Sequence, residues 1–451
     1  MSAASPTVFE PARQTKVYGE FDVVVFGGGP AGIAAAIAAG RAGRSTILVE
    51  RYGFLGGAGT AAGLGNFCGL HANVHGEIRQ VVHGIADDIL ARLERMGALR
   101  APQNFANKIS AQAYDLSCYK IAADELVSAA SAKILFHALG VGAAMADERT
   151  IRALLIETKS GRLAVAGRLF IDCSGDADLA AWAGAPFEFG DGAGRCAYPS
   201  TMMRINAVDP DRAGDAGQII PSLMAEAERD EGRRFPRKGA IVRPQRNPIE
   251  WRANVTQVKN ADGSPVDGTN ADQLSNGEIE GRRQCWETFQ FIRGAAPGFE
   301  QAYIVDIAPQ LGIRETRRII GEYALSDADV LTCADFEDTI GVNGWPVEAH
   351  VAGEVVFRWP QIPQSRGFAQ LPYRMILPRR VDNLLVAGRC ASMTHEGQAS
   401  ARVSGPCFAM GEAAGMAAEI ALRSGTPPRA IDVKLLQGRL EHEGVFLGRR
   451  W

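Results

Sequence analysis

The clearest pattern of hydrophobic positions lies near the N-terminus, where two apolar runs enclose a stretch of small residues. Residues 21–26 read FDVVVF, an almost continuous apolar run that is typical of a buried parallel strand. A glycine-rich turn follows, then small residues that favour a helix as far as about residue 42, and a second apolar strand at 45–49. This order predicts a βαβ unit of about 30 residues.

The middle of the chain changes character. Helices are expected at 74–98 and 115–132, and strands at 134–144, 151–158 and 163–172. From about 209 to 297 the apolar pattern is interrupted by clusters of Asp, Arg, Asn, Gly and Pro. Such clusters are typical of long loops, so this segment is expected to form a second domain suited to a lid or an interface.

A buried strand pattern returns at 383–388 (NLLVAG) and leads into a helix rich in Gly and Ala. The nucleotide-binding part is therefore expected to be discontinuous in sequence. We predict an α/β fold with a discontinuous Rossmann-type domain and an inserted α+β substrate or cap domain. The expected boundaries are 18–75, 133–195 and 375–451 for the Rossmann-type domain, and 76–132 and 196–374 for the cap.

The turn after the first strand carries a dinucleotide fingerprint. Gly27-Gly28-Gly29-Pro30-Ala31-Gly32 satisfies G-x-G-x-x-G between a strand and a helix. In this motif the first Gly makes the tight turn, the second lets the backbone approach a pyrophosphate, and the third lets the helix pack on the strand. Glu50 ends the second strand, where a carboxylate can bind ribose hydroxyls. The combination predicts a dinucleotide site, and the fingerprint alone leaves FAD and NAD open.

Composition and charge exclude several classes of protein. The chain has 451 residues, which favours two domains or one domain with a large insertion. Its net charge is −3 with scattered Lys and Arg, so no nucleic-acid partner is expected. Neither a signal peptide nor a membrane span is visible, and we expect a soluble, cytoplasmic protein without a membrane partner. Eight Cys without a CxxC pair or zinc-like spacing predict reduced thiols and no metal site.

Several segments together resemble a known family. ERYGFLGGAGT, IDCSGDAD, GIRETRR, LLVAGR and RVSGPCFAMGEAAGMAA look like segments of FAD-dependent oxidoreductases of the glutathione-reductase superfold. The closer branch is related to fumarate reductase and succinate dehydrogenase flavoproteins. The resemblance covers most of the nucleotide domain and is thin over about 209–297. It implies FAD as cofactor and an oxidoreductase activity, and it says little about the substrate.

The resemblance also implies which residues contact FAD. The glycine turn, with Gly27, Gly29, Pro30, Ala31 and Gly32, would hold the pyrophosphate. The remaining implied contacts are Glu50 and Arg51 at the adenosine, Gly56, Gly57 and Ala58 along the cofactor, Val141 by its main chain at the adenine, Gly175, and Gly388 and Arg389 at the ribityl chain and pyrophosphate. The helix after Gly405 would point its N-terminus at the flavin pyrimidine edge, where its dipole stabilises negative charge on the reduced ring.

Two absences refine this expectation. Covalent attachment in the fumarate reductase branch uses a His beside the glycine pair, whereas residues 56–63 read GGAGTAAG without a nucleophile. Non-covalent FAD is therefore predicted, although Cys68 and His71 follow closely. A second G-x-G-x-x-G for NAD(P)H and a CxxxxC beside the flavin are both missing from the sequence, which disfavours a pyridine-nucleotide disulfide reductase. The electron donor or acceptor stays open.

Four residues are the candidates for catalysis, because hydride transfer needs a proton donor or acceptor and a means of holding the substrate. His71 follows the glycine loop, His395 lies between the flavin strand and the flavin helix, and Arg402 precedes that helix. Each has a structural alternative: a loop His bonded to backbone, or an ion pair of Arg402 with Glu396. Arg314, in GIRETRR, is expected to open a strand and face the substrate, or else to form an inter-domain salt bridge.

Three other residues have weaker claims to a role. His350 is a further candidate for proton transfer. Cys68 and Cys407 lie in segments expected beside the flavin, where they are either redox-active or simply small buried apolar residues.

The sequence thus predicts an enzyme that transfers a hydride between flavin N5 and a small polar organic substrate. The arginine candidates suggest a carboxylate on that substrate. The alternatives are a flavoprotein that catalyses a net non-redox reaction and an FAD-containing subunit of a larger complex. A homo-oligomer is possible on this interpretation.

Overall fold

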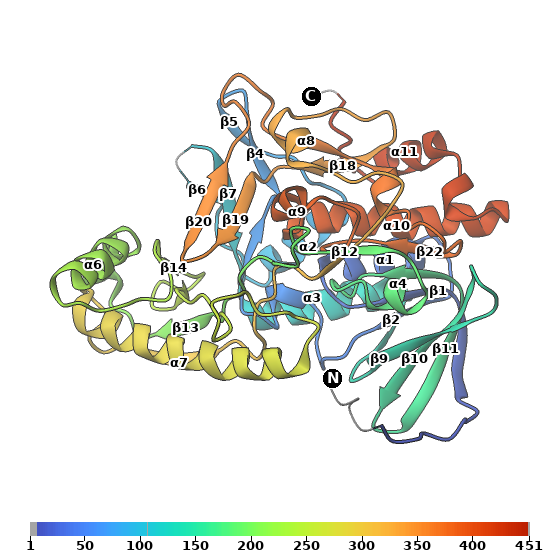
Figure 1. Cartoon of the computed structure of the whole chain (residues 1–451). Helices are drawn as coiled ribbons and strands as arrows, with labels where there is room; N and C mark the ends of the chain where they lie inside the picture. The colour runs from blue at the N-terminus through green and yellow to red at the C-terminus, as the bar shows by residue number, and fades with distance from the viewer. Residues whose placement is uncertain (1–6, 106, 450–451) are drawn as a thin grey trace.

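A seven-stranded sheet organises the larger part of the molecule (Figure 1). The computed structural model describes residues 7–105 and 107–449. The strands of this seven-stranded sheet are β8 (Lys133–Leu135), β2 (Thr46–Val49), β1 (Lys16–Phe26), β11 (Gly161–Asp172), β10 (Ile151–Thr158), β9 (Leu139–Met145) and β22 (Leu384–Val386). The order is β8-β2-β1-β11-β10-β9, with β22 paired to β11. The first four strands and β22 are parallel, while β10 and β9 continue as an antiparallel meander.

The apolar runs explain why these strands lie at the centre. The last four residues of β1 and all four of β2 are buried, because both faces of this part of the sheet are covered. One face packs against α1 (Pro30–Arg41), α2 (Ile85–Arg95), α3 (Leu116–Ala129) and α10 (Ser404–Ser424). The small residues of α1 and α10 let the two helices touch: a Cβ at Gly411 would lie 2.0 Å from the carbonyl oxygen of Ala31.

A second lobe forms the cap, with α6 and α7 at its outer side in Figure 1. Its four-stranded antiparallel sheet has the order β14 (Ile241–Pro244), β15 (Trp251–Asn254), β13 (Met203–Asn206) and β16 (Tyr303–Ile307). The helices are α5 (Pro210–Ala213), α6 (Ala216–Asp230) and α7 (Ala271–Ala295). The lobe has an apolar core of its own, which includes Trp251, Phe289 and Phe299.

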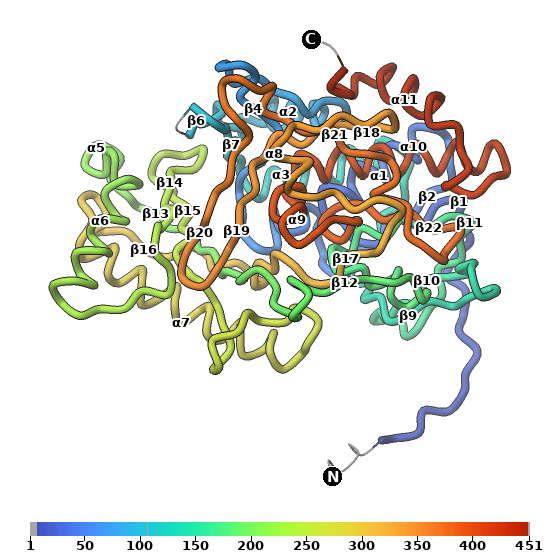
Figure 2. Tube along the Cα trace, turned by 45° about the horizontal axis from the view of Figure 1, so that its top comes forward, coloured from blue at the N-terminus to red at the C-terminus, as the bar shows by residue number. Residues whose placement is uncertain are grey.

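Shorter elements connect the two lobes. A hairpin of β19 (Val347–Val351) and β20 (Glu354–Arg358) lies between the cap sheet and α9 (His395–Ala401) in both views (Figure 2). The other strand pairs are β3 (Asn66–Cys68) with β7 (Ile109–Ala113) and β6 (Gln103–Phe105), β4 (His71–Val74) with β5 (Glu77–Gln80), β12 (Phe187–Phe189) with β17 (Arg317–Ile319), and β18 (Thr339–Asn343) with β21 (Ala369–Pro372). The remaining helices are α4 (Asp178–Trp182), α8 (Asp327–Leu331) and α11 (Val433–His442).

The α/β class and the Rossmann-type βαβ unit predicted from the sequence are confirmed. The helix predicted over 74–98 is wrong in its first half. His75 and Gly76 have φ values of 50° and 101°, which make the tight turn of the β4–β5 hairpin. The helix α2 begins only at Ile85. The segment 76–132, which the sequence placed in the cap, contributes α2 and α3 to the packing against α1 and α10.

Candidate active site

A cavity opens at the carboxyl ends of the parallel strands. The residues that follow β1, β2, β11 and β22 meet there, at the edge of the sheet where ligands bind in open α/β folds. Four short segments form this rim: Gly27–Ala31, Glu50–Tyr52, Cys173–Gly175 and Gly388–Arg389. The cavity then extends past Ala58 towards the N-terminus of α10.

The glycine turn has the geometry that a pyrophosphate requires. Gly27 has φ 102°, and a Cβ there would lie 2.4 Å from the carbonyl oxygen of Cys173. A Cβ on Gly32 would lie 1.8 Å from the carbonyl oxygen of Gly27. At Gly29 the nearest atom to a Cβ is the Cα of Gly57, at 3.8 Å, so this position is open towards the cavity. The first turn of α1 has no side-chain cap and no acidic residue, which leaves its N–H groups for an anion.

Glu50 is fixed beside this turn. It is buried, and its Oε2 accepts a hydrogen bond of 2.6 Å from the amide of Gly28. Its Oε1 accepts one of 2.9 Å from the amide of Tyr52. The carboxylate therefore ties the end of β2 to the glycine turn at the position expected for ribose recognition.

Two groups on the other side of the cavity also suit an anionic cofactor. Arg389 forms an ion pair with Asp176 at 2.8 Å through Nη2. Its Nη1 is buried and has no hydrogen-bond partner among the residues that the structure describes. The helix α10 begins at this cavity after Val403, again without a side-chain cap. The orphaned guanidinium nitrogen and the two free helix N-termini fit the pyrophosphate and the flavin of a dinucleotide.

Most of the residues expected to contact FAD line this cavity. They are Gly27, Gly29, Pro30, Ala31, Glu50, Arg51, Gly57, Ala58, Gly175, Gly388 and Arg389. Gly32 packs under the turn, and Gly56 begins the short 3₁₀ turn that carries Gly57 and Ala58. Val141 lies on β9 and is not one of the lining residues, so its role at the adenine stays a prediction.

A second cavity of about 450 Å³ continues from the first, between the Rossmann-type domain and the cap. The two share the lining residues Ala58, Ala62, Leu64, Asn66, Ile313, Arg402 and Val403. A cofactor in the first cavity that reaches these shared residues would face directly into the second. The second cavity is therefore the candidate substrate site.

Two predicted arginines meet at the junction of the cavities. Arg314 and Arg402 line the second cavity, and Arg402 also lines the first. Arg314 donates from Nη1 to the carbonyl oxygen of Tyr198 at 2.6 Å, and Arg402 donates from Nη2 to that of Glu348 at 3.4 Å. Within residues 7–105 and 107–449, neither guanidinium has a carboxylate within ion-pair distance. Burial and their mutual repulsion lower the pKa of Arg314, and an arginine still keeps its charge at neutral pH.

A carboxylate–imidazole pair lies in the same cavity. Nε2 of His350 is 3.0 Å from Oε1 of Glu348, whose Oε2 accepts from Nε1 of Trp345 at 2.8 Å. Burial raises the pKa of Glu348. The hydrogen bonds from His350 and Trp345 and the charges of His350 and Arg402 lower it by more, so the pKa lies below its usual range. Burial and the charge of Arg314 lower the pKa of His350 to about 3. At neutral pH the pair is thus an ionised Glu348 and a neutral His350 with Nδ1 as its acceptor atom.

The two other predicted histidines lie elsewhere. His71 is a buried residue of β4 and is not among the lining residues of either cavity. Burial lowers its pKa to about 4. His395 begins α9, where its Nδ1 is 2.8 Å from Oε1 of the buried Glu315. It also lies outside both sets of lining residues, so a catalytic role for either histidine stays a prediction.

The cysteines expected beside the flavin do line these cavities, Cys68 the second and Cys407 the first. Burial raises the pKa of each thiol to about 12. Both are therefore neutral at physiological pH, whereas redox exchange needs a thiolate.

Three further arginines in the second cavity were missed by the sequence reasoning. Arg237, Arg243 and Arg252 line it together with Lys238. Arg243 lies in the otherwise apolar stretch AIVRP, and Arg252 lies between Trp251 and Ala253. A charged residue inside a short strand is a signal for a functional cavity. Here the clusters of Gly, Pro, Asn and charged residues around both strands masked their apolar pattern, so neither strand was predicted.

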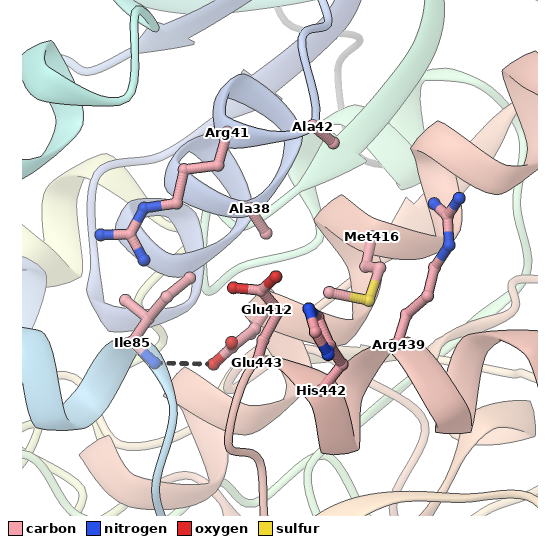
Figure 3. Close-up of a pocket in the computed structure, with 9 residues that line it drawn as sticks. All are labelled: Ala38, Arg41, Ala42, Ile85, Glu412, Met416, Arg439, His442 and Glu443. Carbon is pink, nitrogen blue, oxygen red and sulfur yellow. Dashed lines mark hydrogen bonds between the residues drawn. The ribbon is translucent and has the colours of Figure 1, made fainter.

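A third cavity is lined by residues of α1, α2, α10 and α11 (Figure 3). Glu412 of α10 points into it and is 2 % exposed. Its Oε2 accepts a hydrogen bond of 2.9 Å from the amide of Ile85, the first residue of α2. Burial raises the pKa of Glu412 to about 8, although the Ile85 amide and the charge of Arg41 oppose the shift.

The comparisons with known proteins agree with this geometry. The model of the family described as FAD dependent oxidoreductase matches residues 22–440. The chain belongs to the FAD-dependent oxidoreductase family. It is therefore an enzyme with FAD as its cofactor. No curated protein sequence matches the chain significantly.

Several solved structures match most of the chain at low sequence identity. A geranylgeranyl bacteriochlorophyll reductase-like protein from Thermoplasma acidophilum is 12% identical with a TM-score of 0.47, and the match covers 95% of this chain and 84% of that one. The p-nitrophenol 4-monooxygenase PnpA from Pseudomonas putida DLL-E4 is also 12% identical, with a TM-score of 0.46 and coverage of 93% and 83%. Likeness at this level says nothing about the substrate. Among the described helices of this FAD-dependent oxidoreductase, none combines the length and apolar character that crossing a bilayer requires.

Proposed function

We propose that this FAD-dependent oxidoreductase transfers a hydride between the flavin and a small organic substrate that carries a carboxylate. The observation that carries the proposal is the pair of buried guanidinium groups, Arg314 and Arg402, at the junction of the two cavities. A buried charge without an ion partner is costly, and a carboxylate matches the planar, bidentate geometry of arginine. The substrate would supply the missing negative charge.

FAD, when bound, supplies a two-electron carrier that accepts or gives a hydride at N5. The residues of the chain have two tasks around this chemistry. Arg314 and Arg402 hold the anionic group of the substrate and thereby fix which carbon faces the flavin. His350 accepts the proton that leaves the substrate when it is oxidised, or returns it in the opposite direction.

The position and tautomer of His350 suit this role, whereas burial and the charge of Arg314 lower its pKa to about 3 and make the free ring a weak base. A substrate carboxylate held by Arg314 would offset that charge and raise the basicity of the ring. Its neutral ring donates through Nε2 to Glu348, which fixes the tautomer and leaves Nδ1 free to take a proton. Once the ring is protonated, the adjacent ionised Glu348 stabilises the positive charge. The pair therefore offers a proton acceptor that stays deprotonated well below neutral pH.

An anaerobic screen tests the proposal. The oxidised holoprotein is mixed with carboxylic acids, amines, alcohols and enoates without oxygen, and loss of the visible flavin band is recorded. Bleaching by one or more carboxylates is the expected result. Bleaching by neutral amines or alcohols alone would contradict the carboxylate assignment, and turnover without any electron acceptor would contradict net hydride transfer.

A further inference from the structure

The arginines of the substrate cavity extend far beyond the pair at the flavin. Six cationic side chains line the cavity, Arg237, Lys238, Arg243, Arg252, Arg314 and Arg402, against one carboxylate among the described residues, Glu348. Glu348 is already engaged by His350 and Trp345. Lys238 is also 3.8 Å from Glu354, and the charge of Glu348 attracts Arg237, Arg252, Arg314 and Arg402. Two carboxylates against six cations still leave most of the positive charge in the cavity unbalanced.

The arginines form a row of repelling neighbours that begins at Arg402, which also lines the first cavity. The charge of Arg402 acts on Arg314, that of Arg237 on Arg314 and Arg252, and that of Arg252 on Arg243, each repelling its neighbour. Burial lowers the pKa of Arg237 to about 10, although the charge of Glu348 opposes the shift, and burial with the charge of Arg252 lowers the pKa of Arg243 to about 10. Both are still charged at neutral pH, because a pKa of about 10 lies far above it.

The far end of the row is built on two strands of the cap sheet. Arg243 on β14 and Arg252 on β15 are directly opposite each other in the antiparallel register. Side chains in such a pair lie on the same face with Cβ atoms about 5 Å apart, and like charges there are destabilising. Both side chains line the cavity, so the sheet presents two guanidinium groups to the same space.

The contacts of these arginines leave their donors largely free. Arg237 donates from Nη1 to Oδ1 of Asn254 at 2.8 Å, and Arg252 donates from Nη1 to the sulfur of Met202 at 3.3 Å. Nε of each is buried without a partner among the described residues. Arg243 stacks on the ring of Phe105, 4.0 Å from its centroid, which positions the guanidinium and leaves its edge open. Arg237 and Arg252 are 1% and 5% exposed, so water cannot replace an ion partner fully.

Aromatic and aliphatic side chains line the space between the two ends. They include Phe105, Ile109, Trp345, Val355, Phe357 and Trp359. The rings of Phe357 and Trp359 stack with centroids 5.5 Å apart. This lining suits an apolar or aromatic body and not a continuous chain of polar groups.

We propose that Arg237, Arg243 and Arg252 form a second anion subsite, and that the substrate carries a second acidic group joined to the reacting end by an apolar or aromatic spacer. This inference rests on the proposed function, which places the first acidic group at Arg314 and Arg402. The spacer would lie against the aromatic lining, and the distal acid would neutralise the opposed pair on the cap sheet.

Binding to the holoprotein tests the subsite with defined probes. Adipate, suberate and terephthalate are compared with hexanoate, octanoate and benzoate by calorimetry and by the shift of the flavin spectrum. At least one diacid is expected to bind about tenfold more tightly than its monoacid, the effect of one additional charged hydrogen-bonded contact. Arg243→Met should abolish this preference, and Arg243→Lys should keep part of it. Arg246→Met, an exposed arginine two residues beyond β14, is the matched control and should keep all of it.

The melting temperature of the protein without added anions gives a readout that needs no knowledge of the ligand. Removal of one member of the repelling pair, in Arg243→Met or Arg252→Met, is expected to raise it, because an unpaired buried charge is replaced by an apolar side chain of similar length. A fall of the melting temperature in both variants, or equal binding of diacids and monoacids to the unmodified protein, would overturn the subsite. If Arg402→Met abolishes carboxylate binding while Arg243→Met changes nothing, the proposed function stands and only the second subsite fails.

Discussion

Nε2 of His350 lies 3.0 Å from Oε1 of Glu348 in a cavity whose other charged groups are cationic. The pair comes from one strand, β19, two residues apart, so both side chains are on the same face. Its position on the hairpin between the cap and α9 brings it to the wall of the substrate cavity. The two residues thus add one proton acceptor and one negative charge to a site made otherwise of arginines.

We expect His350→Asn to slow flavin reduction by the substrate about 10²- to 10⁴-fold, the usual contribution of a general base. FAD content should not change, because His350 does not line the FAD cavity. Stopped-flow absorbance under anaerobic conditions measures the rate. Since the pKa of His350 is lowered to about 3, the rate in the unmodified enzyme should not fall between pH 7 and pH 5 on account of this residue. A loss of activity centred near pH 6.5 would point to an ordinary, exposed histidine instead.

Arg402→Met should weaken the binding of a substrate carboxylate by about tenfold or more, since a charged hydrogen bond to a buried group is lost. Arg402→Lys should recover only part of the affinity, because an ammonium cannot bind a carboxylate bidentately. Arg423→Met, an exposed arginine at the other end of α10, serves as the control and should bind like the unmodified protein. Equal affinities in all four proteins would remove Arg402 from the site.

A matched pair of glycine substitutions separates cofactor binding from folding. Gly29→Ala adds a methyl group that meets no protein atom closer than 3.8 Å, so the fold should persist while FAD content falls. Gly32→Ala places a methyl group 1.8 Å from the carbonyl oxygen of Gly27, so both the fold and FAD binding should suffer. Flavin absorbance per protein and a circular dichroism melt report the two effects. Full FAD content in Gly29→Ala would mean that the pyrophosphate lies elsewhere.

Glu412 behind α10 predicts a pH-dependent stability. Its pKa is raised to about 8 in the folded protein, from the ordinary value of 4.5 that an exposed glutamate has in the unfolded chain. Between these values the folded state binds one proton more than the unfolded state, so stability is highest below pH 4.5 and declines as pH rises through 8. Glu412→Gln removes this decline. At pH 9 the variant should be more stable by up to about 5 kcal/mol, with little difference near pH 5.

Urea unfolding at several pH values measures this difference. Glu441→Gln, which changes an exposed carboxylate of α11 outside this cavity, is the control and should follow the unmodified protein at each pH. If Glu412→Gln is the less stable protein at pH 9, the pKa of Glu412 is not raised in the folded state and the hydrogen bond from the Ile85 amide outweighs the burial of the carboxylate.

The parts of the site that the sequence predicted are those encoded within one short segment. The turn from Gly27 to Gly32 and the acid Glu50 follow from local spacing, because strand, turn and helix adjoin in sequence. The arginine row could not be predicted in this way. Arg243 and Arg252 meet only through the pairing of β14 with β15, and both share a cavity with Arg402 only because the cap folds back onto the Rossmann-type domain.

Chain order is also a poor guide to the surroundings of a loop residue. His71 was expected beside the flavin because it follows the glycine loop. The turn at His75 and Gly76 instead folds this segment into the β4–β5 hairpin, and the His71 side chain is buried there. Conversely, His350 is far from both FAD-binding segments in sequence, and the β19–β20 hairpin brings it to the cavity.

The most direct test is a crystal structure of the protein with FAD bound, because the central claim is that the two cavities form one site with the flavin ring at their junction. The predicted result has the pyrophosphate at Gly29 and the isoalloxazine beside Ala58, Asn66 and Val403, with one face open to Arg314 and Arg402. An isoalloxazine ring turned away from the arginine-lined cavity, or a pyrophosphate remote from the glycine turn, would contradict the claim.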